Sequence, residues 1–351
     1  MMFCTPFFIA ALSAAELATV PKTFTASDGG IFRYRWHEPT TVVTNQLYPL
    51  VILMHGSGEC GTNNVSQLTW GATPIVNWFE SKHQEYYLLA GQVPPSGLWS
   101  LIGSVATTPT LSKNPTRPMS QQIELLKGLI EGDLPIDRDR VYVTGVSMGG
   151  YGTWDLISRY PDWFAAAMPV CGGGDLSKAA SLKNLPILIH HGAEDGNVAP
   201  WNSRAMYAAL IFSGSNCARY IEYPNCGHNS WHQAYGNTAN LDWLFAQRRP
   251  PAPKWTPVEP LRDATGAIVI PTPTPHYEIE LKVKAEGHEP IAVVGRRSGV
   301  FPLVTVGGRV VERLAFRLIL GDKQVVIRDS KSGVSFTYSD IRIRPLAKGE
   351  K

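Results

Sequence analysis

One serine in the sequence has the surroundings of a nucleophile. Ser147 lies in the stretch Gly145-Val146-Ser147-Met148-Gly149, after an apolar segment of strand length and before a segment with helical spacing. A Gly-x-Ser-x-Gly motif between a strand and a helix predicts a sharp turn that lifts the serine hydroxyl clear of a sheet. We therefore predict that Ser147 is a nucleophile. The alternative is a tight turn that carries an ordinary surface serine.

A serine nucleophile needs a general base, and the base needs a carboxylate to orient it. For this type of turn the chain order is serine, then acid, then histidine, with each residue after a later strand. Asp195 follows one apolar stretch beyond Ser147, and His228 follows the next. We predict that His228 accepts the Ser147 proton and that Asp195 fixes its tautomer. Glu194 and Asp175 are the rival acids.

Attack on a carbonyl produces an oxyanion that needs two preorganised N–H donors. The amide of Met148, directly after the nucleophile, is the first donor that we predict. The second should come from the loop after a central strand, and residues 55–59 (HGSGE) occupy that place. Within this loop we choose the amide of Ser57, with Gly58 as the alternative.

The other histidines favour structural roles. His55 and His190 end predicted strands, and His191 begins the loop of the acid. His228 and His232 have an i, i+4 spacing that a metal could use. Such a site would need a helix across 227–232 and a third ligand, and it would remove the base from Ser147. We therefore predict no metal and no other cofactor.

Four tryptophans lie in segments expected near the same edge of the sheet. Buried tryptophans more often belong to a core than to a site. As substrate contacts we choose Trp231, Trp99 and Trp201, but not Trp154. Trp231 comes first because it follows His228 by three residues.

The elements that must position these residues alternate along the chain. Strands are expected at 24–26, 31–36, 50–55, 86–90, 141–144, 164–170, 186–190 and 219–223, and helices at 120–130 with Ser120 as its cap, 152–159, 205–212 and 240–246. Apolar strands that alternate with helices indicate a mostly parallel sheet covered on both faces. The predicted fold class is α/β.

The chain divides by composition into four parts. Residues 1–15 are expected to be a signal peptide, and residues 16–249 a catalytic domain of the α/β class. Residues 250–275 are rich in proline and read as a linker. Residues 276–351 alternate with period two, which predicts a small antiparallel β module. This last part holds 14 Lys and Arg against 9 Asp and Glu.

Overall composition excludes several classes of protein. The 351 residues are 44% hydrophobic and 17% charged, which excludes a disordered chain. No apolar run approaches the ~20 residues of a membrane-spanning helix. The net charge of +3 is too small to indicate a nucleic-acid partner. The expected partner is an ester substrate and not a nucleic acid, and no integral membrane segment is expected.

The first residues predict export. The apolar run at 3–12 (FCTPFFIAAL) precedes small residues, with cleavage expected near Ala15, although no Lys or Arg comes before the run. This favours a secreted or periplasmic protein over a buried N-terminal strand. Cleavage would remove Cys4 and leave four cysteines. The strand between Cys217 and Cys226 disfavours a pair between them, whereas a Cys60–Cys226 disulfide stays open.

The segments around these residues resemble the α/β-hydrolase superfamily, in particular its phospholipase/carboxylesterase and dienelactone-hydrolase-like branch, often labelled predicted peptidase. They are LMHGSGECGTNN, IDRDRVYVTGVSMGGYGTWDLISRYPDWFAAAMPVCGGGD, HHGAEDGNV, YPNCGHNSWHQAY and LDWLFAQRR. The resemblance covers most of residues 20–249. It implies Ser147, Asp195 and His228 as the triad and oxyanion donors around Ser57 and Met148. Cys60 stands where relatives usually carry arginine.

The function that we predict is a secreted serine hydrolase that cleaves carboxylic esters through an acyl-enzyme. An exported enzyme with an added β module favours an ester on a polysaccharide, of feruloyl or acetyl type, or a polyester. One alternative is a serine peptidase of the prolyl-oligopeptidase-like group. Those relatives gate their site with a propeller domain, and no such repeat region occurs in this sequence. The other is a non-catalytic carbohydrate-binding protein on a hydrolase fold.

Overall fold

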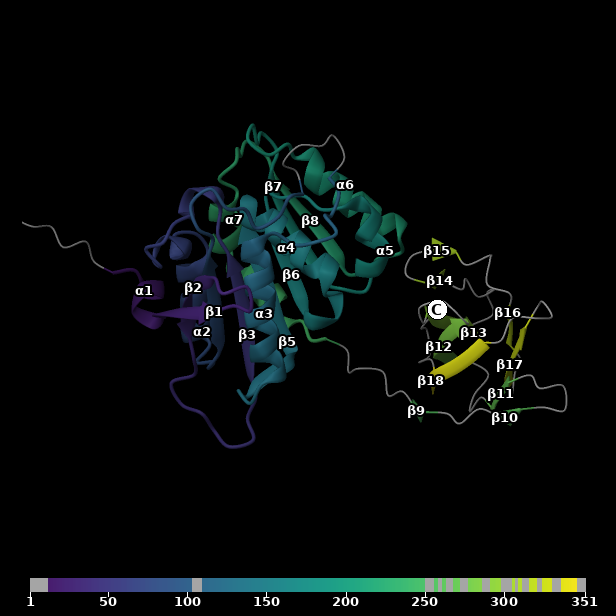
Figure 1. Cartoon of the computed structure of the whole chain (residues 1–351). Coiled ribbons are helices and arrows are strands. Elements are labelled where there is room, and N and C mark those ends of the chain that lie inside the picture. The colour runs from purple at the N-terminus through teal and green to yellow at the C-terminus, as the bar shows by residue number, and fades with distance from the viewer. Residues whose placement is uncertain are drawn as a thin grey trace, which may run out of the picture. The chain divides into compact units, whose positions relative to one another are not determined.

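The computed structural model describes residues 12–102 and 109–249 in full, and after them the strands between residues 256 and 345 (Figure 1). The chain divides into two compact units, Met1–Pro250 and Pro251–Lys351. The residues discussed above as candidates for chemistry all belong to the first unit.

An eight-stranded sheet forms the centre of the first unit, in the spatial order β1-β2-β4-β3-β5-β6-β7-β8. The first two neighbouring pairs are antiparallel and the other five are parallel. The α/β fold with a mostly parallel sheet is therefore confirmed. The strands are β1 (Val20–Thr25), β2 (Ile31–His37), β3 (Tyr48–Met54), β4 (Tyr87–Gln92), β5 (Ile136–Val146), β6 (Ala166–Val170), β7 (Ile187–Gly192) and β8 (Ala218–Tyr223).

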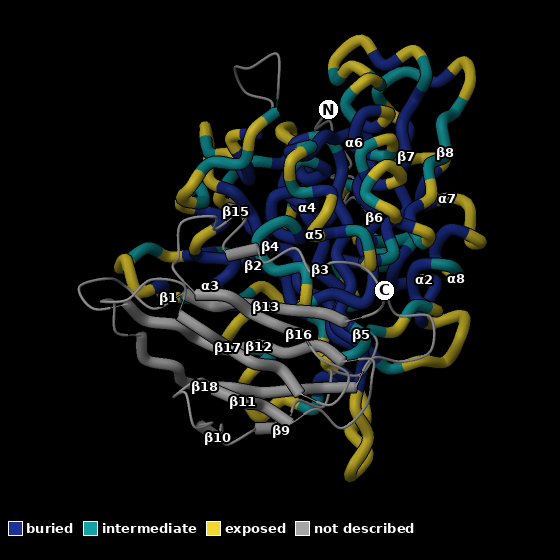
Figure 2. The backbone as a smooth tube through the Cα atoms, turned by 90° about the vertical axis from the view of Figure 1, so that its right-hand side faces the viewer, coloured by how far each residue is buried: buried dark blue, intermediate teal, exposed yellow. Residues whose placement is uncertain are grey.

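The central strands are apolar at every position because both faces of the sheet are covered. In β3 all seven residues are buried. Leu50 and Ile52 pack into one hydrophobic cluster, whereas Val51 and Leu53 pack into another on the opposite face. Figure 2 shows these strands in dark blue, inside a shell of exposed loops.

Helices supply the other half of each cluster. The cluster that holds Leu50 also contains residues of α3 (Arg117–Glu131), α4 (Met148–Arg159), α5 (Ala179–Leu182) and α6 (Trp201–Phe212). The cluster that holds Val51 contains residues of α1 (Ala14–Ala18), α2 (Ala72–Ser81), α7 (Trp231–Gly236) and α8 (Thr238–Ala246). Over the ranges that the structure describes, no helix has the length and apolar character needed to cross a bilayer.

Two predicted helices begin earlier than expected. The helix expected at 120–130 begins at Arg117, because the Thr116 side chain accepts a hydrogen bond from the amide of Met119 and proline fits the first turn. Thr116 is therefore the cap, and the prediction of Ser120 was wrong. The helix expected from residue 152 begins at Met148, directly after Ser147. Glycines in its first turn, which have low helix propensity, hid this start.

The first described residues form a short capped helix. In α1 the Ser13 hydroxyl accepts from the amide of Glu16, and the Glu16 carboxylate accepts from the amide of Ser13. The Arg35 side chain donates to the carbonyl of Glu16, which ties α1 to β2. Cleavage near Ala15 would fall inside this helix. Residues 1–11, which hold most of the predicted signal, lie outside the described residues.

The second unit contains two antiparallel sheets, ordered β10-β11-β17-β16 and β15-β14-β13-β12-β18-β9. Its described elements are all strands, in agreement with the predicted β module. Three of them fall within the segment 250–275, which was predicted to be a linker, and pair with other strands of the unit. The strands are β9 (Thr256–Pro257), β10 (Leu261–Arg262), β11 (Ile268–Pro271), β12 (Tyr277–Ala285), β13 (Ile291–Arg297), β14 (Thr305–Val306), β15 (Arg309–Val310), β16 (Phe316–Leu320), β17 (Gln324–Asp329) and β18 (Phe336–Pro345).

The four cysteines of the described first unit are free thiols. The Cys60–Cys226 disulfide that the sequence left open is therefore not formed. The Cys60 sulfur lies 3.9 Å from the carbonyl oxygen of Gly97, whereas that of Cys226 lies 3.5 Å from the carbonyl oxygen of Gly227. Cys4 lies outside the described residues.

Candidate active site

The turn around Ser147 has the strained geometry that its sequence predicts. Ser147 has φ +54° and ψ −115°, and it connects β5 directly to α4. Its amide donates to the carbonyl of Val170 on β6 at 3.0 Å, which anchors the turn to the neighbouring strand. A Cβ at Gly149 would lie 2.0 Å from the carbonyl oxygen of Met54, and a Cβ at Gly145 would lie 2.5 Å from that of Gly149. Only glycine fits at these two positions.

Gly149→Ala is expected to lower the free energy of unfolding by more than about 2 kcal/mol, because the added methyl group meets backbone atoms that cannot move independently. Gly128→Ala on the exposed side of α3 is the matched control, since a Cβ there meets nothing within 4 Å. That variant should gain about 0.5–1 kcal/mol. Urea unfolding measures both values. A Gly149→Ala protein as stable as the parent would contradict the close approach.

The structure brings the three predicted residues Ser147, Asp195 and His228 into one hydrogen-bonded line. His228 Nε2 lies 2.9 Å from Ser147 Oγ, and His228 Nδ1 lies 2.7 Å from Asp195 Oδ2. Ser147 follows β5, Asp195 follows β7 and His228 follows β8, so all three lie at the carboxyl edge of the sheet. The imidazole is partly exposed, whereas the carboxylate is buried.

The environment of Asp195 keeps this carboxyl group ionised. Burial alone would raise its pKa, but hydrogen bonds from His228 and from the amides of Val198 and Asn197 outweigh burial and hold the pKa below its ordinary value. An ionised Asp195 requires the proton of neutral His228 to reside on Nδ1. Nε2 is then free to accept the proton of Ser147.

The rival acids lie elsewhere. Glu194 is exposed to solvent. Asp175 accepts hydrogen bonds from the amides of Ser177 and Leu111, so that it caps a turn. Neither makes a described hydrogen bond to His228.

The loop expected to hold the second oxyanion donor lies beside the nucleophile turn. β3 pairs with β5, so the residues after Met54 run next to the start of α4. Ser57 is exposed and begins a 3-10 turn, Ser57–Glu59, while the buried Glu59 carboxylate accepts from the indole N–H of Trp70 at 3.0 Å. Met148 is the first residue of α4, where the amide has no acceptor within the helix. Both predicted donors therefore lie on adjacent segments.

Two buried histidines near the site have structural partners. His55 Nδ1 donates to the carbonyl of Gly56 at 2.6 Å, while its Nε2 accepts from the amide of Val93 at 2.9 Å. Burial lowers the pKa of His55 to about 4, and that of His190 to about 3. His190 Nδ1 lies 2.9 Å from the hydroxyl of Tyr223. Both histidines are neutral at neutral pH.

These depressed pKa values predict a loss of stability in mild acid. Between about pH 6.5 and about pH 4 the unfolded chain binds protons at His55 and His190 that the folded protein excludes, so the free energy of unfolding falls as the pH falls. His190→Phe removes one of the two groups. The slope of its free energy of unfolding against pH should be smaller than that of the parent protein by about 1.4 kcal/mol per pH unit. Urea unfolding at several pH values across this range measures both slopes. An unchanged slope would contradict a neutral buried His190.

The three tryptophans chosen as substrate contacts have different positions. Trp231 lies edge-on to the His228 ring at 5.4 Å between centroids. Trp201 is 63% exposed at the start of α6. Trp99 is fully buried and donates its indole N–H to the carbonyl of His55 at 3.1 Å. The prediction for Trp99 was wrong because its ring fills the core, as that of Trp154 also does.

The prediction from sequence missed a thiol beside the triad. Cys171 follows the last residue of β6 with φ +42°, and burial raises its pKa to about 12. Cys171, Asp195 and His228 each place one atom of a type that can bind a metal within 4.8 Å of the other two. His232, which the sequence offered as a partner of His228 in a metal site, is exposed and packs edge-on against Trp70. The signal that could have revealed Cys171 is its place after the strand next to β5.

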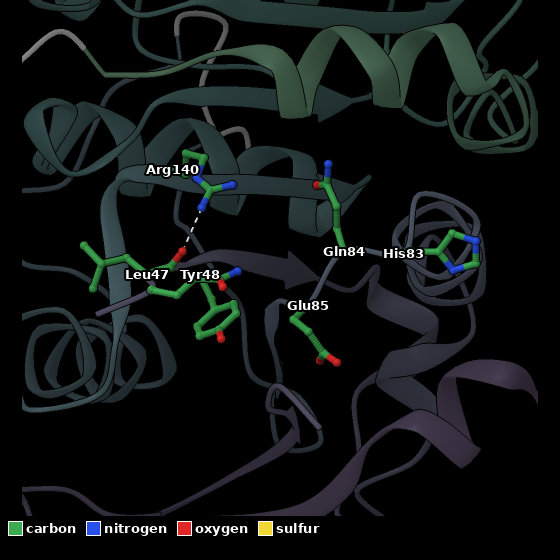
Figure 3. Close-up of a pocket in the computed structure, with 7 residues that line it drawn as sticks. Leu47, Tyr48, His83, Gln84, Glu85 and Arg140 are labelled. Carbon is green, nitrogen blue, oxygen red and sulfur yellow. Dashed lines mark hydrogen bonds between the residues drawn. The ribbon is translucent and has the colours of Figure 1, made fainter. Parts of the chain in front are cut away.

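A separate cavity of about 230 Å³ lies at the opposite edge of the sheet. It is close to the first residue of β3, and the Arg140 guanidinium beside it donates to the carbonyl of Leu47 at 2.9 Å (Figure 3). This cavity is therefore remote from the Ser147 hydroxyl. Its lining residues are Gln46, Leu47, Tyr48, His83, Gln84, Glu85 and Arg140.

The comparison with known proteins agrees with this geometry. A sequence profile described as the Prolyl oligopeptidase family matches residues 111–185 and 174–247, which include Ser147, Asp195 and His228. A crystal structure of a thermostable esterase matches with a TM-score of 0.60 and 36% identity, over 66% of this chain and 64% of that chain. The chain has the α/β-hydrolase fold.

Two curated relatives of this α/β-hydrolase are polyester depolymerases by name. Poly(3-hydroxyalkanoate) depolymerase C of Paucimonas lemoignei is 26% identical over 238 residues, 58% of this chain and 53% of the relative. Poly(3-hydroxyoctanoate) depolymerase of Pseudomonas fluorescens is 32% identical over 123 residues, 32% of this chain and 42% of the relative. The chain thus spans about half of the length of either relative.

Proposed function

We propose that this α/β-hydrolase is a serine esterase that cleaves carboxylic esters through an acyl-enzyme on Ser147. The observation that carries the proposal is the unbroken line of hydrogen bonds from Ser147 through His228 to Asp195. Similarity to a solved esterase over 66% of this chain supports ester chemistry.

The proposed reaction follows from this line. His228 Nε2 takes the Ser147 proton as Oγ attacks the ester carbonyl, and Asp195 stabilises the imidazolium that forms. The amides of Met148 and Ser57 bind the oxyanion. The imidazolium then gives its proton to the departing alcohol. Water, activated by the same imidazole, hydrolyses the acyl-enzyme and restores the serine.

We propose a polymeric ester as the substrate, with a polyester favoured over a feruloyl or acetyl ester of a polysaccharide. The names of the two curated relatives support the polyester. The Trp231 ring is partly exposed and lies edge-on to the His228 ring at 5.4 Å between centroids, so we propose that it contacts the substrate. A polymer that is too large to enter a cell is cleaved outside it, which is consistent with the predicted export.

A serine peptidase is the second candidate, since the matching sequence profile is that of the Prolyl oligopeptidase family. We expect hydrolysis of p-nitrophenyl butyrate with a kcat/KM at least about 100-fold above that for a peptide p-nitroanilide. An amide requires protonation of a poorer leaving group, for which an esterase site need not be arranged. Both substrates release a coloured product, so the two rates can be measured in one assay. A preference for the anilide would replace the esterase by the peptidase.

A further inference from the structure

A second imidazole contacts the carboxylate of Asp195. His191 lies in β7, and its side chain is fully buried. His191 Nε2 lies 3.2 Å from Asp195 Oδ2, the same oxygen that accepts from His228 Nδ1 at 2.7 Å. The carbonyl oxygen of Val198 lies 2.9 Å from His191 Nε2.

We propose that His191 is a positioning residue that holds Asp195 by hydrogen bonding to Oδ2 and thereby moderates the basicity of His228. This inference rests on the proposed role of His228 as the general base. It assigns to His191 a function in the reaction, in place of the structural role that its position at the start of the acid loop favoured.

The neighbours of His191 determine which of its nitrogens carries the proton. Burial lowers the pKa of His191, so its ring is neutral and has a single N–H. Two acceptors, Asp195 Oδ2 and the Val198 carbonyl, face Nε2, which therefore carries the proton. Nδ1 must then accept, and the donor within reach is the Ser203 hydroxyl at 2.7 Å, whose proton the Gly172 carbonyl at 3.1 Å also faces. In the other tautomer the proton would be on Nδ1, and the lone pair of Nε2 would face the Asp195 carboxylate, which is unfavourable.

These contacts connect five side chains in sequence, Ser203, His191, Asp195, His228 and Ser147. The step from His191 to Asp195 is the 3.2 Å contact, and the other three steps are hydrogen bonds. Two amides occupy Oδ1 of the carboxylate, and two imidazoles share Oδ2. The Nε2–H of His191 is shared between the Val198 carbonyl at 2.9 Å and Asp195 Oδ2 at 3.2 Å. Its interaction with Oδ2 is therefore the weaker of the two at that oxygen, and His228 keeps the shorter contact of 2.7 Å. A donor at Oδ2 also offsets part of the negative potential that favours the His228 imidazolium. Loss of this donor should raise the pKa of His228.

The other charged groups around His191 do not replace this contact. Glu222 lies on the neighbouring strand β8, where the Arg204 guanidinium binds its carboxylate in a bidentate pair. Electrostatic interaction links His191 to Glu222 and to His228. Of these groups, Asp195 alone accepts a hydrogen bond from His191 and also contacts the predicted base.

The chain offers a matched control one residue away. His190 is also buried in β7, but its Nδ1 contacts the hydroxyl of Tyr223 and not Asp195. We would compare His191→Phe with His190→Phe in the full chain. Each variant removes one buried imidazole from the same strand, so a general loss of stability should affect both. Only His191→Phe removes a donor from Asp195.

We expect His191→Phe to raise the pKa of His228 by about 0.5–1 pH unit and to lower kcat for p-nitrophenyl butyrate by about tenfold. The pKa is measured in two ways: by NMR titration of labelled histidine, and from the acid limb of kcat/KM against pH. His190→Phe should leave both readouts unchanged. His191→Gln keeps an N–H donor, so the pKa of His228 in this variant should lie between those of the parent protein and of His191→Phe. If His191→Phe does not fold, His191→Gln is used in its place.

Unchanged titration of His228 in both His191 variants would overturn the proposal, as would an equal shift in His190→Phe. The NMR titration does not need turnover. If the parent protein hydrolyses no ester, the proposed function fails, while the effect of His191 on His228 is still measured.

Discussion

Ser147→Ala is expected to lower kcat for p-nitrophenyl butyrate by about 10⁶-fold, because the variant has no oxygen from which an acyl-enzyme can form. The residual rate should be that of water attacking an ester held by the oxyanion donors and the surrounding pocket. The methyl group of alanine fits where the serine Cβ already lies, so the turn between β5 and α4 should be retained. Circular dichroism and the midpoint of urea unfolding test that retention.

A covalent probe separates the loss of the nucleophile from any indirect effect. A fluorophosphonate should add one equivalent of mass to the parent protein, mapped to Ser147, and none to the variant. Ser120→Ala is a suitable control, since Ser120 is exposed on α3 and makes no described hydrogen bond to the triad. If Ser147→Ala kept substantial turnover, or if the probe labelled another serine, the assignment of the nucleophile would be wrong.

Asp195→Asn is expected to lower kcat by about 10⁴-fold near neutral pH. An asparagine that turned its amide nitrogen toward His228 would require Nδ1 to accept a hydrogen bond. The imidazole proton would then move to Nε2, where it blocks transfer from Ser147. The imidazolium that forms during attack would also lose its neighbouring negative charge. The measurement is kcat/KM against pH for both proteins.

Glu194→Gln provides the matched control for this substitution, because Glu194 is the adjacent acidic residue and is exposed. It should change kcat by less than about twofold. Equal losses in the two variants would mean that Asp195 is not distinguished from the surface charge beside it, and the triad would have to be reassigned.

The sequence was sufficient for the features that follow from local pattern. A buried parallel strand and the turn around Ser147 each depend on a few consecutive residues, so the fold and the order of Ser147, Asp195 and His228 could be predicted. The burial of Trp99 in the core could not be predicted, because an aromatic ring is as suitable for a core as for a substrate pocket, and the sequence does not show which residues surround it. The N–H of Trp99 is satisfied by a carbonyl distant in sequence, that of His55.

Contacts between loops of separate strands were also out of reach. Cys171 lies next to Asp195 and His228 because β6, β7 and β8 are neighbours in the sheet. His191 precedes Asp195 by only four residues, but their contact depends on how the chain turns after β7. Neither residue carries a motif that distinguishes it from an ordinary buried side chain. Their part in the site depends on angles and distances that a linear pattern does not contain.

The three members of the triad are supported unequally by the sheet. Ser147 follows β5, which has partners on both sides, whereas His228 follows β8, the outermost strand, which pairs with β7 alone. A strand at a margin can detach at a lower free-energy cost than one in the middle. Detachment of β8 would carry His228 away from Asp195 while Ser147 stays in its turn between β5 and α4. We therefore expect heat to abolish activity before the whole domain unfolds.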